Sequence, residues 1–440
     1  MISLIRKLTA EKLARNTFWM LGGRGVRMVL QAVYFLLIAR ALGTAEYGAF
    51  VGAVALMAIA GPFSSWGTGY LLIKDVARDR RQFQRSWGRA LCITTICSAA
   101  LLCVIHLVSR LIFRGSVPAT VLLMVGISEL FLTNVINLVT QCFVAVEALH
   151  RTAEVNVIWS VARVCAAIIL VASFRTPTAA NWSVLYLLSS LVGTLYGVLR
   201  VTRELGLPSF SFQMHRSEWK EGFYFSIGLA SQSIYNDVDK TMLVRLSGLE
   251  ATGIYGAAYR IIDVMFAPVA SLVYAAYARF FRHGADGLRA TMGFARKLLR
   301  YTTVYGLVTT LILVLASPVM PVFLGPEFAA TSSALRWLSP LVLFKSIHYF
   351  LADALTGSGF QGVRAALQIA VAGLNVVLNV LLIPPYSWKG AACASLASDG
   401  LLALALWIVA NWLARGNWEP SHKPLPQQAV PFASQKSGAQ

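Results

Sequence analysis

Two arginines stand inside a long apolar stretch near the start of the chain. Arg24 and Arg27 are followed by Gln31 and Tyr34 at spacings of three and four residues, which places them on one face of an α-helix. A charged side chain at the centre of a bilayer costs at least about 2.5–3.5 kcal/mol. A planar guanidinium binds phosphate through paired hydrogen bonds. The stripe therefore favours contact with an anion, and interhelical pairing or snorkelling is the alternative that the residues leave open.

Other apolar stretches carry polar stripes at the same helical spacing. Gln232, Asn236 and Asp239 share one face of the stretch 222–246, which takes the matching place in the second half of the chain. Because such side chains cannot face acyl chains, we expect them to face one cavity together with the first stripe. Two further stripes are Glu129, Thr133, Asn137, Thr140 and Gln141 in the fourth stretch, and Lys345, His348, Tyr349 and Thr356 in the tenth.

Four more residues, Arg260, Asn375, Asn379 and Lys74, are candidates for the cavity, each with a structural alternative. Arg260 and Asp263 lie three residues apart and could instead form an internal ion pair. Asn375 and Asn379 could instead hydrogen-bond to neighbouring helices. Lys74 lies at the inner end of its stretch and could simply follow the charge bias of cytoplasmic loops.

Carboxylates at membrane depth are candidates for carrying a coupling ion, a proton or sodium. The candidates are Glu129, Asp239 and Asp263, and structural pairing is the alternative for each.

The composition requires these residues to lie in membrane-spanning helices. Of 440 residues, 57% are hydrophobic and 13% are charged, whereas soluble domains carry roughly 25% charged residues. Apolar stretches follow one another through the chain, without the alternation of barrel strands. We therefore predict an all-α membrane protein of about twelve transmembrane helices. The predicted spans are 16–39, 49–73, 90–113, 119–146, 157–174, 182–199, 222–246, 253–281, 301–324, 335–356, 365–384 and 390–413.

The basic residues predict how these helices are oriented. The net charge is +19, and Lys and Arg gather in alternate connections, such as 74–89 and 279–300. Cytoplasmic loops carry this excess, so both termini are expected in the cytoplasm, and nucleic-acid binding is not expected. The predicted parts are an amphipathic cytoplasmic N-terminus (1–15), an N-lobe of six helices (16–206), a C-lobe of six helices (207–415) and a disordered cytoplasmic tail (416–440).

A weak internal repeat indicates two equivalent halves. An R-x-x-G motif followed by Y-G-A occurs at 40–49 and again at 245–257, and Pro62 and Pro268 lie inside the helices that follow. Paired interruptions in matching helices indicate a transport site between the repeats. Chance similarity between apolar segments is the alternative.

Motifs for catalysis and for metal binding are absent from the sequence. It contains no G-x-x-x-x-G-K-[ST] loop, and its six cysteines form no CxxC pair or His/Cys cluster with metal-ligand spacing. No catalytic triad or carboxylate pair stands in a segment outside the membrane. We therefore expect no enzyme activity, no metal and no cofactor other than a coupling ion.

Several short motifs, in their order and spacing, resemble one family over about residues 12–413. They are similar to the polysaccharide-transport branch, with flippases of the Wzx type, of the multidrug/oligosaccharidyl-lipid/polysaccharide (MOP) exporter superfamily. The motifs are NTFW at 16–19, ARALGTAEYG at 39–48, DKTML at 239–243, TGIYG at 252–256, NVVLN at 375–379, Ile383-Pro384 and Gly390-Ala391-Ala392.

This resemblance implies two six-helix lobes in a V that open alternately to either side, as in multidrug exporters of that superfamily. It implies a flippase that moves an undecaprenyl-pyrophosphate-linked oligosaccharide, an O-antigen or exopolysaccharide repeat unit, from the cytoplasmic to the periplasmic leaflet. The cationic cavity residues of the family correspond to Arg24, Arg27, Lys74 and Arg260.

The resemblance also implies partners and a location. The partners are a lipid-linked anionic oligosaccharide and membrane lipid, with a polysaccharide polymerase and its co-polymerase as further candidates. The location is the bacterial inner membrane. A multidrug or peptidoglycan-precursor exporter of the same superfamily is one alternative, and a membrane-embedded polysaccharide polymerase or ligase is an alternative of another class.

Overall fold

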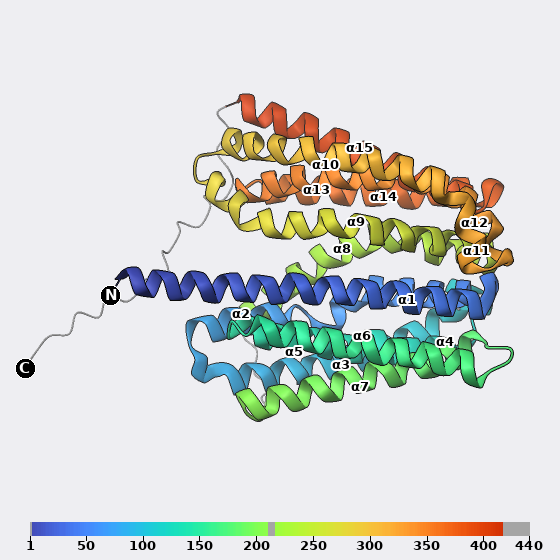
Figure 1. Ribbon diagram of the computed structural model, residues 1–440, viewed down its shortest axis with the longest axis horizontal. Helices are drawn as coiled ribbons and strands as arrows, with labels where there is room; N and C mark the ends of the chain where they lie inside the picture. Colours follow the sequence, from blue (N-terminus) through green and yellow to red (C-terminus); the bar gives the residue numbers. More distant parts are fainter. Residues whose placement is uncertain (1, 210–215, 417–440) are drawn as a thin grey trace, which may run out of the picture. The chain divides into compact units, whose positions relative to one another are not determined.

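The computed structural model describes residues 2–209 and 216–416, and every regular element in these ranges is a helix (Figure 1). The predicted all-α class is confirmed for this part of the chain. Of the predicted tail, residues 417–440 lie outside the described residues. The α-helices are α1 (Ile2–Ser65), α2 (Thr68–Arg78), α3 (Phe83–Phe113), α4 (Ala119–Gly126), α5 (Thr133–Ala145), α6 (Leu149–Ser173), α7 (Ala179–Leu205), α8 (Arg216–Leu246), α9 (Leu249–Gly284), α10 (Leu288–Ala316), α11 (Met320–Leu324), α12 (Ala329–Leu338), α13 (Leu341–Gly357), α14 (Gln361–Tyr386) and α15 (Trp388–Arg415). The shorter elements are the 3-10 helices η1 (Arg80–Gln82), η3 (Ser317–Val319) and η4 (Pro326–Phe328), and the π-helix η2 (Ile127–Leu132).

Most of the helices could cross a membrane. In the described ranges, nine helices are long and apolar enough, or ten if Pro326–Leu338 and Leu341–Gly357, which bend by 43°, are one span. The sequence predicts about twelve, and two features explain the difference. Helix α1 contains two predicted spans in one bent helix, and α8 is too polar to be counted by hydropathy. The count of about twelve and the cytoplasmic placement of the termini stay predictions.

The break in α1 lies at Gly43, where φ is 71° and ψ is 178°. Side chains with a Cβ rarely adopt a positive φ, so glycine makes this turn at little cost. The connection predicted between the first two spans therefore shrinks to one non-helical residue. The two predicted proline interruptions are not helix ends, because α1 continues past Pro62 and α9 continues past Pro268. Each proline still removes one backbone donor from its helix.

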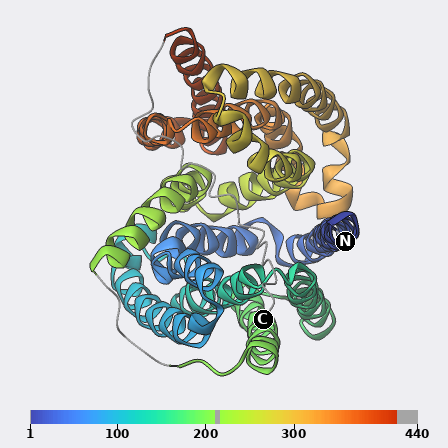
Figure 2. The ribbon, with the colours of Figure 1, turned by 90° about the vertical axis from the view of Figure 1, so that its left-hand side faces the viewer.

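The described chain forms two compact units. The first comprises Met1–Val264, Leu315–Leu338 and Asn375–Ala394. Within it, α1 packs along α6 and α8, and α6 packs along α7. Figure 2 shows α1, α6 and α7 of this unit nearly end-on, so their axes are roughly parallel. The predicted lobe boundaries, 16–206 and 207–415, stay predictions.

Aromatic rings dominate the core of the first unit. Trp182 on α7 is fully buried and stacks against Tyr34 on α1, with ring centroids 6.4 Å apart. Phe50 meets Trp182 and Tyr186 edge-on, at 5.9 and 5.0 Å. Such pairs add to the stabilisation that the buried area provides. They hold the parts of α1 before and after Gly43 against α7, and so position the tyrosines of the site described below.

The second unit comprises Met265–Val314, Ser339–Leu374 and Ser395–Gln440. Its helices are joined by buried polar contacts. The hydroxyls of Thr291 and Ser358 lie 2.7 Å apart, and His348 Nε2 lies 2.9 Å from Asp399 Oδ1. The polar stripe predicted around Lys345 and His348 is buried inside this unit, because both side chains are almost fully covered.

Candidate functional site

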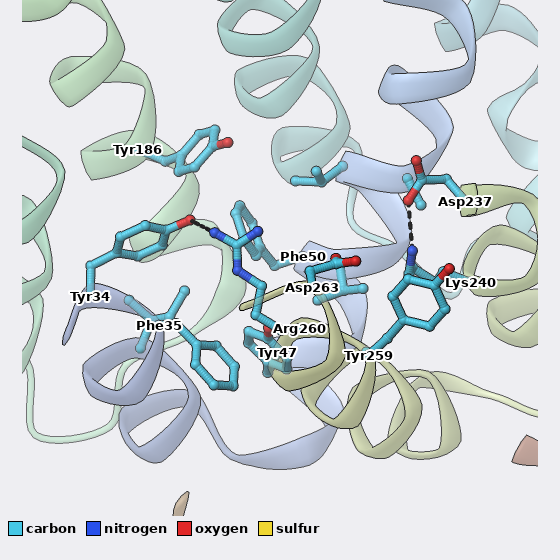
Figure 3. Close-up of a pocket in the computed structure, with 15 residues that line it drawn as sticks. Tyr34, Phe35, Tyr47, Phe50, Tyr186, Asp237, Lys240, Tyr259, Arg260 and Asp263 are labelled. Atoms are coloured by element: carbon cyan, nitrogen blue, oxygen red, sulfur yellow. Dashed lines mark hydrogen bonds and ion pairs between the residues drawn. The ribbon is translucent and has the colours of Figure 1, made fainter. Parts of the chain in front are cut away.

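The first unit contains a cavity of about 140 Å³, here called the arginine cavity, between α1, α7, α8 and α9 (Figure 3). Four tyrosines from three helices stand on its walls, together with two basic and two acidic side chains. These residues are Tyr34, Tyr47, Tyr186, Tyr259, Lys240, Arg260, Asp237 and Asp263. The cavity therefore combines aromatic surface with charge at a depth where charge is costly.

Arg260 is the basic side chain of this cavity that is available to a ligand. Its Nη2 donates to the hydroxyl of Tyr34 at 3.2 Å, and the two side chains point toward each other in Figure 3. In the described part of the chain the guanidinium forms no ion pair, so the alternative of an internal pair with Asp263 is not seen. A guanidinium has five N–H donors. Most of its hydrogen-bonding capacity therefore remains for a ligand.

Lys240 is satisfied within α8 instead. Its Nζ lies 2.7 Å from Asp237 Oδ1, donates to the Asn236 carbonyl oxygen at 2.7 Å, and lies 4.0 Å from the centre of the Tyr259 ring. The ion pair stands on the opposite side of the cavity from Tyr34 (Figure 3). The charges of Lys240 and Asp237 offset each other, which leaves Arg260 as the basic side chain of this cavity without an ion pair in the described chain.

A second and larger cavity of about 560 Å³ lies between α1, α2, α5 and α8, with η2 at its side. We call it the amide cavity, because five side-chain amides line it. It shares Asp237 with the arginine cavity, so the two are neighbours. Its polar side chains are Asn134, Asn137, Gln141, Gln232, Asn236, Thr133, Thr140, Ser65, Ser233, Tyr70, Glu129 and Asp237.

The wall of the amide cavity contains two irregular helical features. Pro62 lines it, and because proline cannot donate to the carbonyl of Ala58, another lining residue, that carbonyl lacks its usual helical partner. Glu129 lies in the π-helix η2, and π-turns occur frequently at functional sites. Asn134 donates to the carbonyl oxygens of Glu129 and Leu130 at 3.1 and 3.0 Å, and so holds this turn together.

Glu129 connects the walls of the two cavities. It accepts a hydrogen bond of 2.5 Å from the hydroxyl of Tyr186, which lines the arginine cavity. The guanidinium of Arg163 lies over the Tyr186 ring, 3.4 Å from its centre, and donates to Ser190 Oγ at 2.8 Å. The described contacts of Arg163 are with these neutral side chains and with the Trp159 ring.

The first predicted stripe is only partly at the cavities. Tyr34 lines the arginine cavity, whereas Arg27 donates to Asn156 Oδ1 at 2.9 Å and lies over the Trp159 ring. The side chain of Arg24 lies outside the described part of the structure. The anion-facing roles of Arg24 and Arg27 therefore stay predictions.

Of the remaining predicted residues, some line one of the two cavities and others do not. Gln232 and Asn236 line the amide cavity, and Arg260 and Asp263 line the arginine cavity. Five others are not among the residues that line either cavity. Of these, Asp239 is buried and accepts hydrogen bonds from the Lys240 amide and the Tyr255 hydroxyl, and Asn379 donates to Asn375 at 2.9 Å. The five are Gln31, Lys74, Asp239, Asn375 and Asn379.

The sequence did not indicate the aromatic residues that complete these walls, whereas it placed the amides Asn137 and Gln141 in a polar stripe. Tyr47, Tyr186 and Tyr259 have no charge to mark them inside apolar stretches. Asn137 and Gln141 did have a signal, since they continue the four-residue spacing of Glu129 and Thr133. In the described chain, no three His, Cys, Asp or Glu side chains are grouped so that they could hold a metal ion.

Comparison with known proteins identifies the family. The model of a family described as "Polysaccharide biosynthesis protein" matches residues 13–283, more than half of the chain. A probable low-salt glycan biosynthesis flippase, Agl15 of Haloferax volcanii, is 25% identical over 56% of this chain and 52% of its own length. An uncharacterized membrane protein of Methanocaldococcus jannaschii is 20% identical over 68% of this chain and 60% of its own length. The chain thus spans between half and two thirds of these relatives.

Solved structures share the fold at low sequence identity. A multidrug resistance MATE family transporter of the MOP superfamily, inward-facing, gives a TM-score of 0.75 at 13% identity, covering 88% of this chain and 94% of that chain. The lipid II flippase MurJ, inward closed, gives a TM-score of 0.71 at 12% identity, covering 90% and 87%. The predicted MOP-type fold of a multi-pass membrane protein is confirmed.

Proposed function

Because the chain belongs to the polysaccharide biosynthesis protein family, we propose that it is a flippase that moves a lipid-linked glycan across a membrane. The family, the archaeal flippase relative and the transporter fold indicate a transporter rather than an enzyme. In its finer form, the proposed cargo is an undecaprenyl-pyrophosphate-linked repeat unit of O-antigen or exopolysaccharide. It would move from the cytoplasmic to the periplasmic leaflet of a bacterial inner membrane, where a polymerase and co-polymerase would take it up.

One observation carries this proposal: an arginine without an ion pair stands beside an amide-lined cavity, within the same unit. A pyrophosphate needs strong donors, and Arg260 can offer a bidentate pair. Sugar hydroxyls need groups that both donate and accept, which amide side chains provide. The neighbouring cavities therefore match the two chemically different parts of one lipid-linked glycan.

The cavities lower the barrier to flipping without covalent chemistry. Moving a polar group into hydrocarbon without a hydrogen bond costs roughly 2–7 kcal/mol. A sugar pyrophosphate carries many such groups, so spontaneous flipping is very slow. Partners for the phosphate and hydroxyls at membrane depth replace the lost water, while the lipid tail stays in the bilayer. Alternating access and a coupling proton or sodium ion, with Glu129, Asp239 or Asp263 as carrier, belong to the proposal.

Flipping by the purified protein in liposomes tests the role of Arg260. Proteoliposomes would contain a polyprenyl-pyrophosphate disaccharide, and an impermeant glycosidase outside would report the fraction that crosses. Arg260→Ala removes a bidentate contact, and two charged hydrogen bonds of about 1.5–3 kcal/mol each predict a loss of about 100-fold or more in apparent affinity. Arg260→Lys should lose less, since it keeps the charge but not the planar fork.

Arg279→Ala is the matched control, because Arg279 is an exposed arginine on the same helix and lines neither cavity. It should flip like the unchanged protein. Unaltered flipping by Arg260→Ala would refute the proposed phosphate contact. Failure of the unchanged protein to flip the glycan, with extrusion of cationic dyes instead, would identify a multidrug exporter.

A further inference from the structure

The two cavities differ in the charged side chains that line them. The arginine cavity contains two basic side chains, Lys240 and Arg260, beside Asp237 and Asp263, and Arg260 donates to the Tyr34 hydroxyl and lies over its ring. Among the described residues that line the amide cavity, the charged ones are Glu129 and Asp237, and none is basic. An anionic group therefore finds basic partners in the arginine cavity and only acidic charged neighbours in the amide cavity.

The negative charge of the amide cavity comes chiefly from Glu129. Asp237 is paired with Lys240 at 2.7 Å, which offsets its charge. Glu129 accepts from Tyr186 at 2.5 Å and from Thr133 at 3.5 Å, both neutral hydroxyls, and forms no ion pair in the described chain. Arg163 is the nearby cation, but it lies over the face of the Tyr186 ring and donates to Ser190.

The rest of the wall suits uncharged, strongly hydrated groups. A side-chain amide both donates and accepts, the combination that hydroxyl and acetamido groups of sugars require. Asn134 and Asn236 already donate to backbone carbonyl oxygens of their own segments. The carbonyl of Ala58, left without its helical donor by Pro62, is a further acceptor. These groups can hydrogen-bond to a neutral sugar. None of them can neutralise a sugar carboxylate.

We infer that the amide cavity is the glycan subsite and that it selects by charge. It accepts neutral sugars and sugars with a free amino group, and it rejects uronic acids and other acidic sugars. This inference rests on the proposed function, since the pyrophosphate must occupy the arginine cavity for the glycan to reach the amide cavity. At about 6–8 Å and an effective dielectric near 20, two like charges repel by roughly 2–3 kcal/mol.

A pair of ligands that differ only in one group tests the inference. The two probes are short-chain polyprenyl-pyrophosphate disaccharides whose distal sugar is a hexose or the corresponding hexuronic acid. Binding to the purified protein in detergent would be measured by calorimetry. We expect the neutral probe to bind at least about tenfold more tightly. Glu129→Gln keeps an acceptor for Tyr186 and should bring the two affinities to within about threefold.

The control is Glu250→Gln, the same change at an exposed residue that lines neither cavity, which should keep the full preference. Equal affinity of the unchanged protein for both probes would overturn the inference and leave the proposed function intact. A preference that Glu129→Gln leaves unchanged would also overturn it. Binding of neither probe would instead contradict the proposed function.

Discussion

The close contact between α1 and α9 leads to a testable prediction, because it holds Arg260 in place. At Gly48 on α1 and Gly253 on α9 the two backbones touch. A Cβ on Gly48 would overlap the carbonyl oxygen of Leu249, and one on Gly253 would overlap that of Thr44. Small residues at helix crossings permit such close approach in membranes. Arg260 follows two turns after Gly253, so the contact sets its distance from α1.

Gly48→Ala should therefore destabilise the first unit. The group in the way is backbone, which cannot rotate aside as a side chain can, so the helices must separate. Overpacking typically costs about 1–3 kcal/mol, and we expect the upper part of this range, about 2–3 kcal/mol. Separation also moves α9 relative to Tyr34, so the affinity for a pyrophosphate-linked glycan should fall about tenfold or more.

The assays are denaturant unfolding in detergent micelles and glycan binding, measured on the same preparations. Gly373→Ala on α14 is the control, because a Cβ there meets nothing within 4 Å. Exchanging a helical glycine for alanine without a clash should stabilise by up to about 1 kcal/mol. The two variants should thus shift stability in opposite directions. Equal shifts for both, or unchanged stability of Gly48→Ala, would refute the backbone contact between α1 and α9.

Two further predictions concern single hydrogen bonds. Tyr34→Phe removes the acceptor that orients Arg260 at 3.2 Å, and glycan binding by calorimetry should weaken about three- to tenfold while unfolding changes little. His348→Leu removes the partner at 2.9 Å from the buried carboxylate of Asp399, and unfolding in detergent should show a loss of about 1–3 kcal/mol. Unchanged binding in the first variant, or unchanged stability in the second, would contradict the corresponding contact.

Helix class and polar faces could be predicted from the sequence because both follow from local periodicity. Gln232 and Asn236 fall on one face at a four-residue spacing, and the structure places both on the wall of the amide cavity. The four-residue spacing of Glu129, Thr133 and Asn137 likewise indicated a polar face. A lone aromatic residue such as Tyr186 gives no comparable signal, because its ring is indistinguishable from an apolar residue in the hydropathy pattern.

The partners of each polar face could not be predicted from the sequence. Arg260 meets Tyr34 across 226 positions, and Arg27 meets Asn156 across 129. Periodicity says which way a side chain points from its own helix, but only packing decides which helix lies opposite. The π-helix at Ile127–Leu132 was also unpredicted, since one extra residue in a turn leaves no mark on an apolar sequence.

Helix α8 shows why hydropathy and function must be considered together in this fold. It is not among the helices of the described chain that pass as membrane spans, although it lies between α7 and α9 in sequence and packs along α1. The residues that lower its hydropathy include Gln232, Asn236, Asp237 and Lys240, which line the two cavities or form the ion pair there. Polar side chains of this kind are tolerated at membrane depth only where they face protein or water. The same polar residues therefore lower the hydropathy of α8 and line the two cavities. A more apolar α8 would cross a membrane at less cost, but it would offer a sugar no hydrogen-bonding partners.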